Sequence, residues 1–198
     1  MGKTQRKGRS GEQSLTPFLD PLQAVQDLLD AFGERGVIVG GIAVSLLGRP
    51  RFTADVDAVF LLEMEELPRL LEEAAARGIE ARIADVETFA RQNRIILLRH
   101  TASGIDIDIA LGILPFESEM VDRSRRVTIG DLQLRLPTPE DLIILKAVAH
   151  RPQDLLDIEA VTASHPGLDK ERIRYWVRQF AETLEMPELW DDLEARLK

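Results

Sequence analysis

Hydrophobic residues recur along the first half of the chain with two different spacings, one helical and one strand-like. In residues 17–32 the apolar side chains follow a helical spacing, and Asp20 is the expected N-cap of this helix. Residues 37–39 and 52–62 are rich in β-branched and apolar residues, which is typical of buried strands. Residues 105–109 alternate isoleucine with aspartate, the pattern of a strand with one polar face. This mixture predicts an α/β fold, with helices packed on a sheet.

The same patterns predict two hairpins and further helices. Residues 94–100 and 105–109 are joined by a short turn, which favours an antiparallel pair. Residues 126–136 predict a smaller hairpin around Gly130. Other expected elements are helices at 41–48, 67–77, 86–93 and 115–125, and a strand at 79–83.

After Pro137 the pattern changes to helices alone. Thr138 is a suitable N-cap, Pro139 fits the first helical position and Asp141 the third, for a helix that ends near Ala149. Three more helices are expected at 152–164, 169–184 and 187–197, and Asp169 is the expected N-cap of the helix that ends at Leu184.

Three segments of different character therefore divide the chain. Residues 1–14 are polar and rich in glycine, and they are expected to form a disordered tail. A nucleic-acid-binding arm is the alternative for this tail, because it carries Lys3, Arg6, Lys7 and Arg9. Residues 15–136 are expected to form the α/β unit, and 137–198 a helical C-terminal subdomain.

Composition limits the classes of function. The 198 residues carry a formal net charge of -9 and a pI near 4.9, which argues against binding a long nucleic acid through a broad basic surface. No apolar run is long enough to span a membrane. The absence of cysteine excludes disulfides, thiolate catalysis and cysteine zinc sites. These features fit a cytoplasmic protein.

Gly40-Gly41 follows the strand at 37–39 and begins the next helix. Glycine lets backbone N–H groups approach a phosphate closely, and a helix directs its positive end toward such a group. A tight strand-to-helix turn also requires glycine for steric reasons alone. The pair is therefore compatible with a phosphate site without identifying one. The Walker motif and the spaced dinucleotide fingerprint are absent.

Aspartates alternate with apolar residues on two of the expected strands. Asp55 and Asp57 lie near the start of the strand at 52–62, and Asp106 and Asp108 repeat this spacing on a later strand. Residues i and i+2 of a strand share a face, so each pair directs two carboxylates to one side. Carboxylates that converge from adjacent strands can hold divalent cations such as Mg²⁺ or Mn²⁺. A solvent-facing sheet edge is the alternative, strongest for Asp106.

Together these motifs resemble the nucleotidyltransferase superfamily whose type member is DNA polymerase β. The resemblance lies in Gly40-Gly41, in Asp55-Val56-Asp57 and in a third carboxylate on a hydrophobic strand. Residues 136–158 are more narrowly similar to the AbiEii-like abortive-infection toxin transferases. The resemblance covers about residues 20–165. It implies a mixed sheet with flanking helices and a C-terminal helical extension.

The resemblance also implies roles for the carboxylates. It assigns binding of the metal and of the nucleoside triphosphate to Asp55 and Asp57. Asp108 is the expected third metal ligand because it lies centrally in its hydrophobic strand, and Asp106 is the alternative. All three ligands would act on Mg²⁺ or Mn²⁺.

In the family's last motif, a lysine and an aspartate on adjacent helices reach back over the site. Lys146 is then expected to contact the triphosphate, and Asp157 to orient or deprotonate the acceptor, with Arg151 and Asp154 as supporting charges. A surface ion pair is the alternative for these residues. Because Gly41 stands where the motif also allows serine, no hydroxyl is available there. Phosphate binding would rest on the backbone and nearby cations, expected at Gly40, Gly41, Arg49, Arg51 and Lys146.

The expected activity is transfer of a nucleoside monophosphate from a triphosphate such as ATP to a hydroxyl or phosphate acceptor. The resemblance to toxin transferases implies an RNA acceptor, such as a tRNA 3′ end, and an antitoxin protein as partner. A small hydroxylated molecule, as in antibiotic-modifying relatives, is one alternative. A nucleotide-binding regulatory module without turnover is the other.

Overall fold

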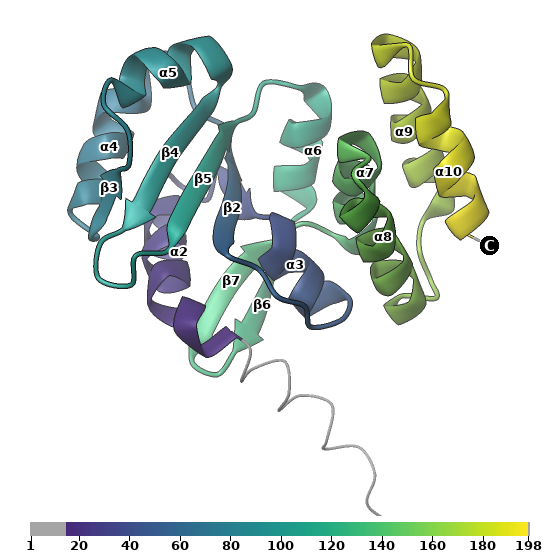
Figure 1. The fold of residues 1–198 in the computed structure, drawn as a ribbon, viewed down its shortest axis with the longest axis horizontal. Coiled ribbons are helices and arrows are strands. Elements are labelled where there is room, and N and C mark those ends of the chain that lie inside the picture. Colours follow the sequence, from purple (N-terminus) through teal and green to yellow (C-terminus); the bar gives the residue numbers. More distant parts are fainter. Residues whose placement is uncertain (1–14, 198) are drawn as a thin grey trace, which may run out of the picture.

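A mixed five-stranded sheet lies at the centre of the computed structural model, which describes residues 15–197 (Figure 1). The tail predicted at 1–14 lies outside these residues. The strand order is β1-β2-β5-β4-β3, and β2 and β5 are parallel while the other neighbours are antiparallel. The strands are β1 (Gly36–Ile38), β2 (Asp55–Phe60), β3 (Ile79–Ala81), β4 (Ile95–His100) and β5 (Asp106–Leu111). The predicted hairpin of β4 and β5 is confirmed, as is the mixed sheet.

A second, two-stranded sheet packs beside the first. It is the predicted small hairpin, formed by β6 (Arg125–Ile129) and β7 (Leu132–Leu136). The Arg135 N–H on β7 donates a 2.8 Å hydrogen bond to Gln26 Oε1 on α2 (Leu19–Ala31). This bond fixes the hairpin against a helix that is distant in sequence.

The first helix begins earlier than its sequence pattern predicts. A 3-10 turn, η1 (Thr16–Phe18), leads directly into α2, and Phe18 is the N-cap residue. The prediction of Asp20 as N-cap was therefore wrong, because the 3-10 turn begins at Thr16 and the chain continues into α2 without an extended residue. Asp20 instead lies in the first turn, where an acidic side chain stabilises the positive end of the helix.

The remaining helices surround the sheet and follow the predicted pattern within a few residues. One face of the sheet packs into the core with Val56, Ile107, Ile96 and their neighbours, while the other face carries the aspartates. The helices not yet named are α3 (Gly40–Leu47), η2 (Met64–Glu66), α4 (Leu67–Ala75), α5 (Val86–Asn93), α6 (Pro115–Arg123), α7 (Pro139–Ala149), α8 (Pro152–Ser164), α9 (Lys170–Leu184) and α10 (Glu188–Arg196).

Helices α7 to α10 pack together at one end of the sheet (Figure 1). Two predicted caps are confirmed there: the Thr138 hydroxyl accepts the Asp141 N–H at 3.3 Å, and the Asp169 carboxylate accepts the Arg172 N–H at 3.0 Å. Within the part of the chain that the structure describes, every helix is too short or too polar to cross a membrane.

Helix α3 connects the sheet to these helices. Before its first turn, the Val39 N–H donates to the Asp57 carbonyl oxygen on β2 at 2.8 Å. At its other end, Gly48 lies against α8, and the Ser164 hydroxyl donates to the Gly48 carbonyl at 3.3 Å. The His165 ring contacts the Leu47 carbonyl at 2.6 Å. Both ends of α3 are therefore held, one by β2 and one by α8.

Candidate active site

The parallel pairing of β2 and β5 brings the four aspartates together. Asp55 lies opposite Asp106, and Asp57 lies opposite Asp108. Because neighbouring strands in register direct paired residues to the same face, all four carboxylates share the face that looks away from the core. The structure therefore places Asp108 beside Asp57, as the third-ligand hypothesis requires.

Gly40 allows the Asp57 carboxylate to lie directly against the start of α3. A Cβ atom added to Gly40 would lie 1.8 Å from Asp57 Oδ2, a distance that no side chain could tolerate. Gly40 also has φ +61°, in the left-handed region that favours glycine. The steric interpretation of the glycine is thus confirmed, and the absence of a side chain leaves room for the Asp57 carboxylate.

Negative charge accumulates at this point of the sheet. Burial raises the pKa of Asp57 above its ordinary value, and the charges of Asp55 and Asp108 raise it further. Lys146 and Arg151 act in the opposite direction on the same pKa but do not cancel it. The pKa of Asp108 is raised as well, chiefly by burial. A pair of carboxylates in this state favours a bound cation.

Asp106 is in a different electrostatic state from Asp108. Its Oδ1 accepts a 2.7 Å hydrogen bond from Arg99 Nε, and its Oδ2 lies 2.8 Å from Arg82 Nη1. The hydrogen bond from Arg99 lowers the pKa of Asp106 below its ordinary value, with a further contribution from the charge of Arg82. Two arginines therefore neutralise Asp106, which supports Asp108 as the third carboxylate.

Lys146 lies in a buried cluster of charges on α7 and α8. Its ammonium group is 2.8 Å from Asp154 Oδ1 and 3.1 Å from Asp157 Oδ2. The side chain of Lys146 is 7% exposed, and those of Asp154 and Asp157 are 1% and 2% exposed. The alternative of a surface ion pair does not hold, because the three side chains are buried.

Two arginines complete this cluster. Arg51 Nε lies 3.0 Å from Asp157 Oδ1, and Arg151 Nε donates to Asp154 Oδ2 at 2.7 Å. Both oxygens of Asp157 are therefore engaged with cations. By contrast, Arg49 is exposed and does not belong to the lining of the cavities described below.

Two adjoining cavities meet at Asp57, Lys146 and Arg151. One, of 380 Å³, has a polar lining that includes Gly41, Arg51, Thr53, Asp55 and Gln153. The other, of 260 Å³, is mostly apolar and is lined by Val39, Gly40, Ala58, Val59, Ile95, Asp108, Ala110, Leu142, Leu145 and Ala149. The two cavities therefore share the Asp57 carboxylate, but one is polar and the other is mostly apolar.

Thr53 is a residue of this site that its sequence pattern did not indicate. Its hydroxyl donates to Asp55 Oδ1 at 3.1 Å, and it lies over the backbone of Gly41. A Cβ atom added to Gly41 would be 2.4 Å from Thr53 Oγ1 and 2.8 Å from Thr53 Cβ. Thr53 thus occupies the space in which a serine at position 41 would lie. The sequence signal for Thr53 was its position, since it places a hydroxyl two residues before Asp55.

We expect Gly41→Ser to reduce the stability of the protein by about 1–3 kcal/mol, because the new side chain overpacks against Thr53. Urea denaturation monitored by circular dichroism measures the change. The double variant Gly41→Ser with Thr53→Gly should be less destabilised than the sum of the two single variants. Strict additivity of the two would contradict a direct contact.

The donors at this site suit a hard divalent cation, since they are carboxylate oxygens. Asp108 Oδ1 is also buried, and its nearest cation in residues 15–197 is Arg82, which forms an ion pair with it at 2.7 Å. Across the same described residues, no three His, Asp or Glu side chains already form a metal-binding group. The residues therefore fit Mg²⁺ or Mn²⁺ by type and strand register, but the ligands have not converged.

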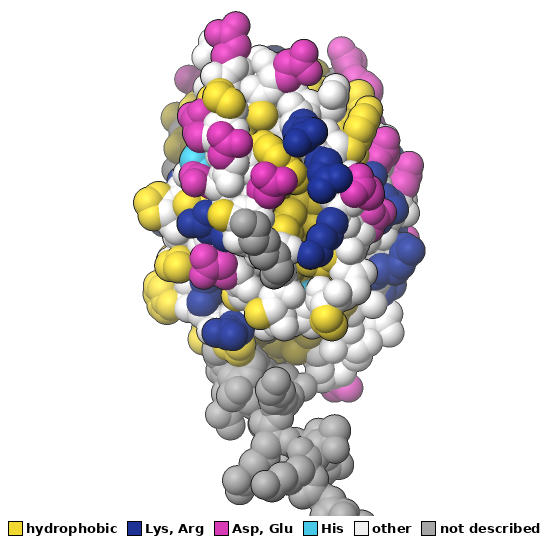
Figure 2. Space-filling view, turned by 90° about the vertical axis from the view of Figure 1, so that its right-hand side faces the viewer, with side chains coloured by type: hydrophobic (Ala, Val, Ile, Leu, Met, Phe, Trp, Pro, Cys, Tyr) yellow, Lys and Arg dark blue, Asp and Glu magenta, His cyan; other side chains and the backbone are white. Residues whose placement is uncertain are grey.

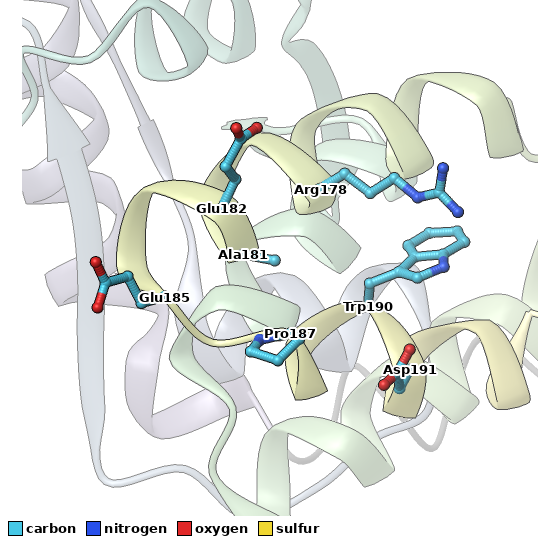
Figure 3. A pocket seen from close by; sticks show the side chains of 7 residues that line it. All are labelled: Arg178, Ala181, Glu182, Glu185, Pro187, Trp190 and Asp191. Atoms are coloured by element: carbon cyan, nitrogen blue, oxygen red, sulfur yellow. The ribbon is translucent and has the colours of Figure 1, made fainter.

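A larger cavity, of 510 Å³, lies between α9 and α10, away from the aspartates. Arg178 extends over the ring of Trp190, with 4.9 Å from its guanidinium carbon to the ring centroid, while Glu182 and Glu185 point away from the ring (Figure 3). None of the predicted site residues lines it. We therefore place the candidate active site at the aspartates.

Comparisons with solved structures agree with this fold. The antigenic nucleotidyltransferase-like protein from Paracoccidioides brasiliensis is 17% identical, with a TM-score of 0.55, covering 92% of this chain and 95% of that one. The antibiotic-resistance factor ANT(2'')-Ia in solution is 14% identical, with a TM-score of 0.55, covering 91% and 96%. The crystal structure of ANT(2'')-Ia with adenylyl-2''-tobramycin is 16% identical, with a TM-score of 0.53, covering 82% and 95%.

Comparisons of sequence give a narrower result than comparisons of structure. No curated protein matches the chain. The narrower resemblance to the AbiEii-like toxin transferases is not confirmed. One family model matches residues 19–193, which is most of the chain. The chain therefore belongs to the family described as nucleotidyl transferase of unknown function (DUF2204).

Proposed function

We propose that this protein is a metal-dependent nucleotidyltransferase that moves a nucleoside monophosphate from a triphosphate to a small hydroxylated acceptor. The observation that carries the proposal is the register that aligns Asp57 with Asp108 beside the start of α3. Asp55, Asp57 and Asp108 would hold Mg²⁺ or Mn²⁺. When bound, this ion would neutralise the triphosphate and polarise its α-phosphorus.

The polar cavity is the proposed site of the triphosphate. Arg51 and Arg151 line it, together with the backbone of Gly41 in the first turn of α3. Cations and helix-start N–H groups stabilise phosphate charge. Lys146 also lines this cavity, and its charge acts on Asp57.

In the proposed reaction, the acceptor oxygen forms a bond to the α-phosphorus while the bond to the pyrophosphate oxygen breaks. The acceptor proton passes to a carboxylate, for which we propose Asp108, because it lines the apolar cavity proposed for the acceptor and lies opposite Asp57. Asp157 was assigned this role by resemblance. Since both of its oxygens are engaged with Lys146 and Arg51, we propose that Asp157 instead positions these two cations.

The apolar cavity favours an uncharged acceptor. Its carboxylates are Asp57 and Asp108, which the proposal assigns to the metal. Among its described lining residues, no further acidic group remains to bind a polycation such as tobramycin. On the face drawn in Figure 2, described Lys and Arg side chains lie among Asp and Glu side chains rather than forming a continuous basic surface. The formal net charge of -9 favours a small acceptor over RNA.

A transfer assay tests the proposal. The protein is incubated with Mg²⁺ and each α-³²P-labelled nucleoside triphosphate, in separate reactions with 2-naphthol, tobramycin and total RNA. We expect label on the uncharged hydroxyl compound and none in reactions with the Asp57→Asn variant. Label on RNA or tobramycin alone would overturn the acceptor class and preserve the reaction. No label, together with a thermal shift by Mg²⁺ and ATP, would favour the nucleotide-binding regulatory module.

A further inference from the structure

Arg82 is a charged residue near the site to which the proposed reaction assigns no role. It directly follows β3, and its N–H donates to the Leu97 carbonyl at 3.1 Å, so its backbone is fixed beside β4. Its guanidinium group bridges two carboxylates of β5. Nη1 lies 2.8 Å from Asp106 Oδ2, and Nη2 lies 2.7 Å from Asp108 Oδ1.

The two contacts of Arg82 differ in quality. On the Asp106 side, Arg99 provides a second cation to the same carboxylate. On the Asp108 side, Arg82 is the one cation in the described chain that forms an ion pair. Asp108 Oδ1 is nevertheless buried without a well-oriented hydrogen bond. Because Arg82 contacts both carboxylates, it can release Asp108 while it stays paired with Asp106.

We propose that Arg82 is a positioning residue that binds Asp108 in the metal-free protein and remains on Asp106 alone once a divalent cation binds Asp57 and Asp108. This inference rests on the proposed metal-dependent function. A guanidinium group and a divalent cation are both positive and compete for the same carboxylate. Arg82 thus weakens metal binding until it releases Asp108.

Binding of Mn²⁺ alone to the full chain tests the inference. Free Mn²⁺ is measured by electron paramagnetic resonance at increasing metal concentration, without nucleotide. We expect Arg82→Gln to bind Mn²⁺ about two- to fivefold more tightly than the wild type, the size expected for loss of one partly exposed charge contact. The matched control is Arg99→Gln, which removes the other arginine from Asp106, and its affinity should stay close to that of the wild type.

Several results would overturn the inference. Equal or weaker Mn²⁺ binding by Arg82→Gln would show that Arg82 does not compete with the ion. An equal gain in Arg99→Gln would show a general effect of charge. No Mn²⁺ binding by the wild type or by Arg82→Gln would overturn the metal site as well. If the wild type binds Mn²⁺ and Arg82→Gln binds it with the same affinity, the inference about Arg82 fails while the proposed metal site stands.

A measurement on the wild type guards against misfolding of the variant. Addition of Mg²⁺ should shift the side-chain ¹⁵Nε resonance of Arg82, because the guanidinium group loses one of its two carboxylates. The resonance of Arg99, which contacts Asp106 in both states, should move much less. Equal shifts of the two resonances, or a static Arg82 signal while Mg²⁺ binds, would also contradict the proposal.

Discussion

Replacement of Asp57 by asparagine is expected to reduce nucleotidyl transfer by about a thousandfold while raising the melting temperature of the metal-free protein. The loss follows because a catalytic metal contributes several kcal/mol and each 1.36 kcal/mol corresponds to about tenfold in rate. The gain in stability follows from the pKa of Asp57, which burial and the charges of Asp55 and Asp108 raise in the folded state.

The sign of this stability effect depends on pH. A carboxyl group whose pKa is raised by folding destabilises the folded state once it ionises, so the cost is absent below its ordinary pKa of 3.8 and complete above the raised value. The asparagine variant avoids this cost. Its advantage in melting temperature should therefore be present at neutral pH and disappear as the pH falls below 3.8.

Thermal unfolding across pH and transfer from α-³²P-labelled ATP measure the two effects. Asp131→Asn is the matched control, because Asp131 is an exposed turn residue remote in sequence from the strands of the site. It should change neither transfer nor the pH dependence of unfolding. Retained transfer in Asp57→Asn would contradict the proposed metal ligand, and a lower melting temperature at neutral pH would contradict the electrostatic account.

Replacement of Lys146 by methionine is expected to reduce the free energy of unfolding by about 3 kcal/mol, the lower end of the range for breaking a buried ion pair. Methionine preserves much of the side-chain volume but leaves Asp154 and Asp157 without their shared cation. Arg151 and Arg51 still contact these aspartates and limit the loss. For a chain of 198 residues this is about 6–12 °C in melting temperature.

A second substitution checks the origin of this effect. Adding Asp154→Asn to Lys146→Met removes one of the two carboxylates left without Lys146, while an asparagine can still accept the Arg151 N–H at the start of α8. The double variant should be more stable than Lys146→Met alone in denaturant unfolding. If the double variant instead loses as much stability as the two single substitutions added together, the loss does not arise from an unpaired buried charge.

Local patterns were sufficient to predict the elements that carry the site. The alternation of isoleucine and aspartate placed Asp106 and Asp108 on one face of a strand, and the short turn before them predicted the hairpin. The sequence of neither strand indicates that β2 pairs in parallel with β5. This pairing decides which aspartate lies beside Asp57, so the choice between Asp106 and Asp108 required the register.

Contacts between distant segments could not be predicted in the same way. Arg82 lies more than twenty residues before the carboxylates that it bridges, and no local pattern distinguishes it from other surface arginines. The burial of Asp157 likewise depends on the packing of α3, α7 and α8. The helical pattern of α8 indicated which residues share a face with Asp157, but it did not indicate that Arg51 would contact Asp157.

Helix α3 has a mechanical consequence for substrate entry. It has eight residues, which at 1.5 Å per residue make a rigid spacer of about 12 Å. One end is fastened to β2 next to Asp57 and the other to α8, so the sheet and the C-terminal helices cannot separate by bending at Pro137 alone. These two contacts limit how far the gap beside the two cavities can widen. Under the proposed function, acceptors would therefore enter through an opening of limited width.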